Sequence, residues 1–158
     1  MYKLVIKSVV NVVMIISLCW SGSAMAQGST GGHMIGGYLG FTDRDDADFT
    51  FGAEYEYQMR SQWSVGATIE YTPDVVLGRD FTLVLGTANF RPSTMPRLKL
   101  IGGLGVEFRE AAGDDVRARI GAGYDVYQGG ITVTPRLALD FGDGGENVVL
   151  GVTLSGRF

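Results

Sequence analysis

The sequence is poor in cysteine, proline, histidine and lysine, and two of these shortages exclude particular kinds of protein. Its one cysteine is Cys19, so a fold held together by internal disulfides is excluded. Its one histidine is His33, so a catalytic site that uses histidine as an acid or base would have to be built on this residue. The formal net charge is only −4 and favours no nucleic-acid partner. Glycine, in contrast, is abundant at 24 of 158 residues, in a chain whose length fits a single domain.

The first 26 residues have the organisation of a secretory signal peptide. Lys3 and Lys7 give a positive start, and residues 9–20 form an apolar stretch. Small residues then lead to a cleavage site that ends at Ala26. The alternative is a retained membrane anchor. It is disfavoured because the apolar stretch is short of the ~20 residues that a spanning helix needs.

Cleavage after Ala26 predicts a mature chain without cysteine. A lipoprotein modified at Cys19 is disfavoured, because bulky Leu18 stands where a small residue is wanted. The removed segment carries two lysines and no acid, so the mature chain has 11 basic and 17 acidic residues and a formal charge of −6. Residues 27–34 are predicted to be a flexible lead-in. The stability of the mature chain must come from something other than disulfides.

From residue 35 onward the dominant pattern is an alternation of period two, which indicates β-strands with two different faces. In residues 49–58 every odd position is apolar or aromatic, and every even position is polar or glycine. Residues 63–71 repeat the pattern, and no helical period follows the signal peptide. The predicted strands are residues 35–42, 49–58, 63–71, 81–91, 98–109, 116–126, 131–141 and 148–158.

Eight segments of this length predict an antiparallel up-and-down barrel that crosses a membrane. Each is near the ~9–11 residues that a tilted transmembrane strand needs, and an even count returns both ends to one side. We therefore expect an all-β fold, an eight-stranded transmembrane β-barrel over residues 35–158. The connections around Arg60, Thr94 and Gly129 are expected on the periplasmic side. Four short outer loops, rich in Asp and Gly, are expected at residues 43–48, 72–80, 110–115 and 142–147.

The alternation alone does not say which face points outward, because a soluble barrel has its apolar face inside and a membrane barrel has it outside. Here the polar face carries six acidic and six basic residues, a balance that suits a narrow interior where charges must be paired. The expected lumen charges are Glu54, Glu56, Glu70, Lys99, Glu107, Arg109, Arg117, Arg119, Asp125, Arg136, Asp140 and Arg157. Glycine on the same face leaves room for these long side chains in a small barrel. The glycines are Gly52, Gly66, Gly103, Gly105, Gly121 and Gly123.

Aromatic residues on the apolar face fall near the two ends of the predicted strands, with Leu, Val, Ile and Ala between them. Two aromatic girdles around an aliphatic belt suit two membrane interfaces. The periplasmic girdle is expected to contain Tyr55, Tyr57, Trp63, Tyr124 and Phe158. The outer girdle is expected to contain Phe41, Phe49, Phe51, Tyr71, Phe81, Phe108 and Phe141.

Two segments fit the alternation less well. In residues 81–91, Phe81 and Leu83 fall on one face but Val84 and Phe90 fall on the other, so the register is left open. Pro135 lies in the middle of a predicted strand and lacks the N–H that a ladder hydrogen bond needs. We expect a bulge or a local widening of the sheet at that position.

Three stretches resemble the small outer-membrane β-barrel family, which includes the OmpX-type proteins and the OmpA-type transmembrane domains. Residues 51–71 are similar to the family's strand–turn–strand unit, residues 100–108 to its glycine-rich strand, and residues 148–158 to its last strand. The resemblance implies an integral protein of the outer membrane of a Gram-negative bacterium, in contact with outer-membrane lipids and lipopolysaccharide. In this family a C-terminal aromatic residue, here Phe158, belongs to the signal read by the outer-membrane barrel assembly machinery. Gly156 departs from the aromatic residue often found two positions earlier.

The sequence offers little for catalysis, cofactors or metals, and we expect none of these sites. His33 precedes the first predicted strand and has no nucleophile beside it. Glu54 and Glu56 share a face, but interior ion pairs explain them better than hydrolysis does. The first outer loop contains an acidic cluster that misses the spacing of a calcium loop and predicts a solvated loop. Its members are Asp43, Asp45, Asp46 and Asp48.

The leading interpretation is a non-enzymatic, monomeric outer-membrane barrel that contributes to membrane structure or integrity, with a lumen closed by paired charges. Among those charges we predict pairs between Glu107 and Arg119 and between Asp140 and Arg117. The first alternative is a narrow ion or small-solute channel, if the charges line a continuous water path. The second is adhesion or host binding, against which the short outer loops argue.

Overall fold

The computed structural model describes residues 32–43, 47–73, 80–109, 113–143 and 145–158. The predicted signal peptide, its cleavage site at Ala26 and most of the lead-in lie outside these residues. Asp45, Asp46 and parts of the predicted outer loops lie outside them as well. Within the described residues, no helix has the length and apolar character needed to cross a membrane.

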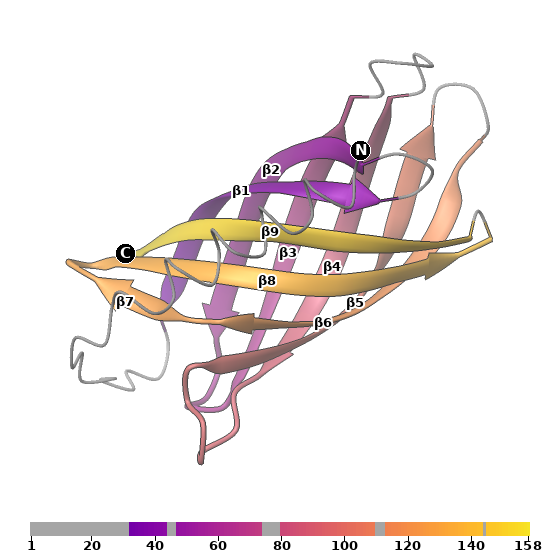
Figure 1. Cartoon of the computed structure of the whole chain (residues 1–158). Coiled ribbons are helices and arrows are strands. Elements are labelled where there is room, and N and C mark those ends of the chain that lie inside the picture. The colour runs from indigo at the N-terminus through magenta and orange to yellow at the C-terminus, as the bar shows by residue number, and fades with distance from the viewer. Residues whose placement is uncertain (1–31, 44–46, 74–79, 110–112, 144) are drawn as a thin grey trace.

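The described chain forms one antiparallel sheet that closes on itself into a barrel (Figure 1). Its strands are β1 (His33–Asp43), β2 (Ala47–Gln58), β3 (Trp63–Thr72), β4 (Phe81–Phe90), β5 (Leu98–Arg109), β6 (Asp115–Tyr124), β7 (Val126–Gln128), β8 (Ile131–Gly142) and β9 (Gly145–Arg157). β7 continues the line of β6 after an interruption at Asp125, so the two act as one strand of the barrel. We call each of the eight continuous strands of the ring a stave. Consecutive staves pair, and β1 pairs with β9 to close the ring. The predicted eight-stranded antiparallel barrel is confirmed.

Side chains alternate strictly between the interior and the exterior. In β1, Met34 and Tyr38 are buried inside the barrel, whereas Ile35 and Leu39 are 56% and 54% exposed on its outside. The same alternation leaves large apolar side chains exposed on every full-length stave. Among the buried residues described, polar and charged ones outnumber apolar ones. This arrangement is the inverse of a soluble barrel and suits surrounding lipid.

The register of β4, which the sequence left open, places Phe81 and Leu83 inside the barrel. Phe81 pairs with Thr72 of β3, and Leu83 pairs with Glu70. Directly paired residues share a face of the sheet, and both β3 residues are buried in the interior. Phe81 is therefore not part of the outer aromatic girdle, and that prediction was wrong. Val84 is on the outside instead.

The ladder is interrupted where Pro135 lies in β8. On the β6–β7 side, pairing stops after Gly123 with Arg136 and resumes at Val126 with Val133. The register is the same on both sides of the gap, so the strand holds no inserted residue. Of the two alternatives predicted at Pro135, the bulge does not form, and the pairing is interrupted locally instead. The gap falls beside the one residue of this strand that has no N–H to donate.

The β7–β8 hairpin turns at Gly129 and Gly130, which have φ angles of 57° and 88°. Both lie in the left-handed region that glycine adopts at little steric cost, as a two-residue hairpin turn with right-handed strand twist requires. Residues 59–62 and 91–97 make the other two connections at this end of the barrel. This end corresponds to the one predicted to face the periplasm.

Candidate functional site in the barrel interior

The interior of the barrel contains a dense set of charged side chains at inward positions. They form three groups. Two of the groups meet at Glu54, and the third lies nearer the end of the barrel with the outer loops. Nearly all of these side chains are less than one-tenth exposed. Because an unpaired charge at such burial costs several kcal/mol, the partners of each one decide what the interior can do.

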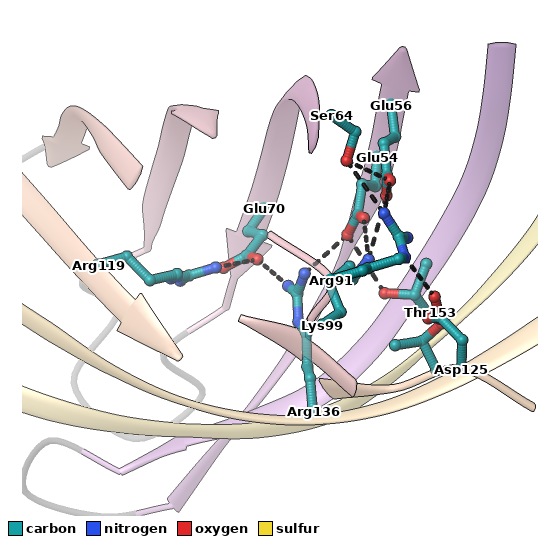
Figure 2. A network of polar contacts seen from close by, with 11 residues as sticks. Glu54, Glu56, Ser64, Glu70, Arg91, Lys99, Arg119, Asp125, Arg136 and Thr153 are labelled. Atoms are coloured by element: carbon teal, nitrogen blue, oxygen red, sulfur yellow. Dashed lines mark hydrogen bonds and ion pairs between the residues drawn. The ribbon is translucent and has the colours of Figure 1, made fainter. Parts of the chain in front are cut away.

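The first group is built around Arg91 and Lys99 (Figure 2). Arg91 Nη1 lies 2.7 Å from Glu56 Oε1, and Arg91 Nε lies 2.9 Å from Asp125 Oδ2. Lys99 Nζ lies 3.2 Å from a carboxylate oxygen of Glu54 and 3.2 Å from one of Glu56. Two hydroxyl groups complete the group, since Ser64 donates to Glu56 at 2.6 Å and Thr134 donates to Asp125 at 2.8 Å.

The second group is built around Arg119 and Arg136. Arg119 donates two hydrogen bonds to Asp140, at 2.6 and 2.7 Å, and two to Glu70, at 2.6 and 2.8 Å. Arg136 donates to Glu54 at 2.8 Å and also to Glu70. The Arg136 guanidinium carbon also lies 3.7 Å above the centre of the buried Tyr38 ring, a cation–π arrangement.

The third group joins β5 to β6 near the outer-loop end. Arg117 Nε lies 3.0 Å from Glu107 Oε2, and Arg117 Nη2 lies 3.1 Å from Asp115 Oδ2. Arg109 bridges the same two carboxylates, with 2.8 Å between its Nη2 and Asp115 Oδ2. Arg117 Nη1 also donates to the carbonyl oxygen of Gly145 at 2.7 Å.

These contacts correct the predicted pairing. Asp140 pairs with Arg119 and not with Arg117, and Glu107 pairs with Arg117 and not with Arg119. The cause is the register: Arg119 stands directly opposite Asp140 on β8, while Glu107 stands opposite Asp115 on β6. The charges were assigned to the correct face, but their cross-strand neighbours were misplaced by two positions.

Several bridges connect staves that are not neighbours. Lys99 on β5 and Arg136 on β8 both reach Glu54 on β2. Arg119 on β6 reaches Glu70 on β3. In each case two staves lie between the partners along the ring. These side chains therefore span the interior and do not merely follow its wall, as Figure 2 shows.

A row of threonine hydroxyls crosses the first three strands beyond the second group. Thr50 Oγ1 lies 2.9 Å from that of Thr42 and 2.7 Å from that of Thr72. All three residues are buried, and the row runs through directly adjacent strands β1, β2 and β3. On the side of β1, β2 and β3, neutral hydrogen bonds thus continue the polar interior toward the outer-loop end.

The other charges predicted for the lumen also lie on the expected face, with one at its rim. Arg157 is exposed at the end of β9, where it donates to the side chain of Gln58 at 3.2 Å. Sequence reasoning missed two buried members, Arg91 and Asp115. Arg91 follows the inward-facing Asn89 by two positions, and Asp115 precedes the inward-facing Arg117 by two. Extending the alternation of each predicted strand by one step would therefore have placed both residues in the interior.

The expected girdle residues other than Phe81 lie on the outside of the barrel. Those most exposed are Phe41, Phe49, Phe51, Tyr55, Trp63, Phe108, Tyr124 and Phe158, whereas Tyr57, Tyr71 and Phe141 are half-buried. Neighbouring rings contact one another: the centroids of Trp63 and Phe90 are 4.8 Å apart, and those of Phe51 and Tyr71 are 5.4 Å apart. Phe90 is an outward ring that sequence reasoning left unassigned.

His33 belongs to the aromatic residues at the end opposite the outer loops. Its Nδ1 lies 2.8 Å from the Tyr55 hydroxyl, and its ring stacks on Phe158 at 5.7 Å between centroids. The backbone N–H of Phe158 donates to the His33 carbonyl at 3.1 Å. These contacts connect the first strand to the chain terminus. Over the described part of the chain, no three His, Cys, Asp or Glu side chains are grouped to hold a metal ion.

Comparison with solved structures identifies the architecture. The N-terminal β-barrel domain of Pseudomonas aeruginosa OprF superposes with a TM-score of 0.55 at 15% identity, covering 82% of this chain and 100% of that one. The chain has the fold of a small outer-membrane β-barrel. Yersinia pestis Ail, in a phospholipid bilayer nanodisc, gives a TM-score of 0.56 at 15% identity, with 81% and 99% covered. Neisserial surface protein A gives 0.57 at 8% identity, with 82% and 98% covered.

At such low sequence identities, sharing the outer-membrane barrel fold does not imply sharing a function. No family model matches the sequence, and no curated protein does either.

Proposed function

We propose that the protein is a non-enzymatic, monomeric barrel of the Gram-negative outer membrane that contributes to membrane structure and does not conduct solutes. The observation that carries the proposal is the set of ion pairs from Lys99, Arg119 and Arg136 to carboxylates on non-neighbouring staves. An eight-stranded barrel has an interior only wide enough to be filled by side chains. Bridges across that interior close it and at the same time hold opposite walls together.

The exterior supports the membrane part of the proposal. Large apolar residues are exposed around the barrel, including Leu104 at 68% and Val116 at 69%. Exposure of this extent on consecutive strands is unfavourable in water and favourable in lipid. Outer-membrane lipids and lipopolysaccharide are the partners that would cover this surface. The assembly machinery would read the last strand and its Phe158 before that residue stacks on His33.

A test is planar-bilayer conductance of refolded residues 27–158. A shift in gel migration on heating would confirm beforehand that each sample is folded. The wild type is expected to be silent, and Lys99→Ala/Arg136→Ala is expected to conduct because two cross-lumen side chains are shortened. Leu137→Ala, on the lipid-facing side of β8, is the matched control and should be silent.

One outcome would overturn the closed lumen, and another would overturn the role of Lys99 and Arg136 in closing it. Reproducible conductance steps from the wild type would favour a narrow channel with the interior charges as its selectivity elements. Silence from a folded Lys99→Ala/Arg136→Ala barrel would mean that these charges are not what closes the lumen.

The narrow channel is the second candidate, and the glycine-lined part of the interior favours it. Gly103 and Gly105 on β5 stand directly opposite Arg119 and Arg117 on β6, and Gly121 and Gly123 follow on β6. This sector of the wall presents no side chains of its own at four inward positions. A Cβ at each of these four glycines would lie 3.3 Å or less from a neighbouring atom, so a water path along this sector would require the wall to widen.

A further inference from the structure

Two short turns lie side by side at the end of the barrel opposite the outer loops (Figure 1). Residues 59–62 join β2 to β3, and residues 91–97 join β4 to β5. The backbone N–H of Arg91 donates to the carbonyl oxygen of Gln62 at 2.8 Å, and this hydrogen bond ties one turn to the other. We call the surface that the two turns form together the paired turns.

The paired turns expose apolar side chains beyond the ends of the strands. Met59 is 48% exposed and Met95 is 54% exposed, and both lie in the turns themselves. The N–H of Met59 donates to the carbonyl oxygen of Trp63 at 3.1 Å, and the Trp63 ring packs on Phe90 in the aromatic girdle of this end. Apolar groups that continue an aromatic girdle past the strand ends are unfavourable in water and suit the boundary between acyl chains and head groups.

The same surface is positively charged. Arg60 is exposed in the first turn and Arg97 is half-buried in the second, and neither turn contains an aspartate or a glutamate. Arg97 already interacts within the chain and adds only its charge, whereas the side chain of Arg60 has no partner among the residues that the structure describes. The backbone N–H and C=O groups of Arg60 both bond to Trp63, at 3.1 and 3.3 Å. The Arg60 guanidinium is therefore available to a ligand that lies along the Trp63 ring.

The opposite end of the barrel has exposed charges of the other sign. They include Asp43, Asp114, Asp143 and Glu146. A negatively charged ligand is therefore attracted to the paired turns and repelled by the outer-loop end. An amphipathic anion satisfies both features of the paired turns, because its charged group pairs with Arg60 while its apolar part covers the exposed methionines.

We propose that the paired turns bind an anionic phospholipid of the phosphatidylglycerol class, in the leaflet at the periplasmic side of the membrane. The forked donors of the Arg60 guanidinium match two oxygens of the phosphodiester. The acyl chains pack against Trp63 and the exposed methionines. Phosphatidylethanolamine carries the same phosphate, but its own ammonium group neutralises the head group and weakens the attraction to arginine. The inference rests on the proposed placement in the outer membrane and adds a lipid preference at one end of the barrel.

Trp63 reports on the lipids beside the paired turns, because it is the single tryptophan of residues 27–158 and its backbone bonds to Arg60. The barrel is refolded into vesicles of equal parts phosphatidylglycerol and phosphatidylethanolamine, with bromine atoms on the acyl chains of only one of the two lipids. The ratio of the two quenching efficiencies measures which lipid is enriched beside Trp63. Both leaflets contain both lipids, so the ratio does not depend on the direction of insertion. We expect phosphatidylglycerol to be enriched about fivefold, as one arginine near an anionic head group supplies.

Three variants make the test specific. Arg60→Gln should remove the enrichment, so that the two brominated lipids quench Trp63 equally. Ser61→Gln is the matched control, because it introduces the same side chain at the neighbouring exposed position of the turn, and it should keep the enrichment. Met95→Cys carries the only thiol of residues 27–158, and a polarity-sensitive fluorophore attached to it should report an apolar environment in the vesicles.

Equal quenching of the wild type by the two brominated lipids, or an enrichment that survives in Arg60→Gln, would overturn the site. An aqueous environment at the fluorophore of Met95→Cys would place the second turn clear of the bilayer. The exposed methionines would then fit a periplasmic protein, and the assignment to lipid would be wrong. Failure of the proposed membrane placement gives a different result, because neither brominated lipid would then quench Trp63 and gel migration would not shift on heating.

Discussion

Arg119 holds Asp140 with two hydrogen bonds of 2.6 and 2.7 Å, and the two residues stand directly opposite each other on β6 and β8. The same guanidinium also binds Glu70 on β3, so one side chain neutralises carboxylates on both sides of the interior. Loss of Arg119 would therefore leave Asp140 without its ion-pair partner, whereas Glu70 would keep Arg136.

Replacing Arg119 by Met should lower the free energy of unfolding by about 3–5 kcal/mol, because it leaves Asp140 buried without its partner. Urea unfolding in lipid vesicles measures the change. In the double variant Arg119→Met/Asp140→Asn the loss should be smaller than the sum of the two single losses, since the stranded charge is gone. A single variant as stable as the wild type would contradict the pairing.

Gly105→Ala should destabilise the barrel by about 1–3 kcal/mol through overpacking. A Cβ added there would lie 1.9 Å from the carbonyl oxygen of Val84, which belongs to the backbone and has little freedom to move. Gly86→Ala is the matched control. Its added Cβ would approach nothing closer than 3.8 Å, so its effect should stay within about 0.5 kcal/mol. Equal effects of the two substitutions would refute the close approach of β4 and β5.

Thr50→Val should cost about 1–3 kcal/mol, because it removes one hydroxyl and leaves those of Thr42 and Thr72 short of a buried partner. Thr42→Val, at the end of the same row, interrupts only one contact and should cost about half as much. Both can be measured by urea unfolding. If the two variants lose the same stability, the hydroxyl row is not continuous through Thr50.

Trp63 should report directly on which face meets lipid. It is the single tryptophan of residues 27–158 and is 46% exposed on the outside of the barrel. On insertion into vesicles its fluorescence should shift to shorter wavelength, and brominated lipids should quench it more strongly than aqueous acrylamide does. Strong quenching by acrylamide in the inserted protein would mean that the faces are reversed.

The sequence predicts the barrel well because each strand repeats one simple rule, apolar at one position and polar or glycine at the next. That rule assigns Glu54, Arg119 and Arg136 to the interior without any knowledge of their neighbours. It misassigns Phe81 and leaves Leu83 undecided, since these two and Leu85 are apolar on one face of the strand while Val84 and Phe90 are apolar on the other. Only pairing with Thr72 and Glu70 turns Phe81 and Leu83 inward.

Interior partners are harder to predict than interior faces. The face of a residue depends on its own strand, whereas its cross-strand neighbour depends on the relative stagger of two strands, and a shift of two positions preserves every face. Such a shift separates the predicted Glu107–Arg119 pair from the observed Glu107–Arg117 pair. Bridges such as Lys99 with Glu54 depend further on how the whole sheet curves into a ring.

The strict alternation along each stave has an evolutionary consequence. Outward positions need only be apolar and inward positions need only be compatible with their immediate partners, so the two faces can accumulate substitutions independently. A substitution at outward-facing Ile35 or Leu39 leaves the partners of inward-facing Glu54 unchanged. Side chains on the lipid side can change shape freely as long as they stay apolar. Barrels of this kind can therefore share their architecture with almost no sequence similarity, as the 8% identity to Neisserial surface protein A illustrates.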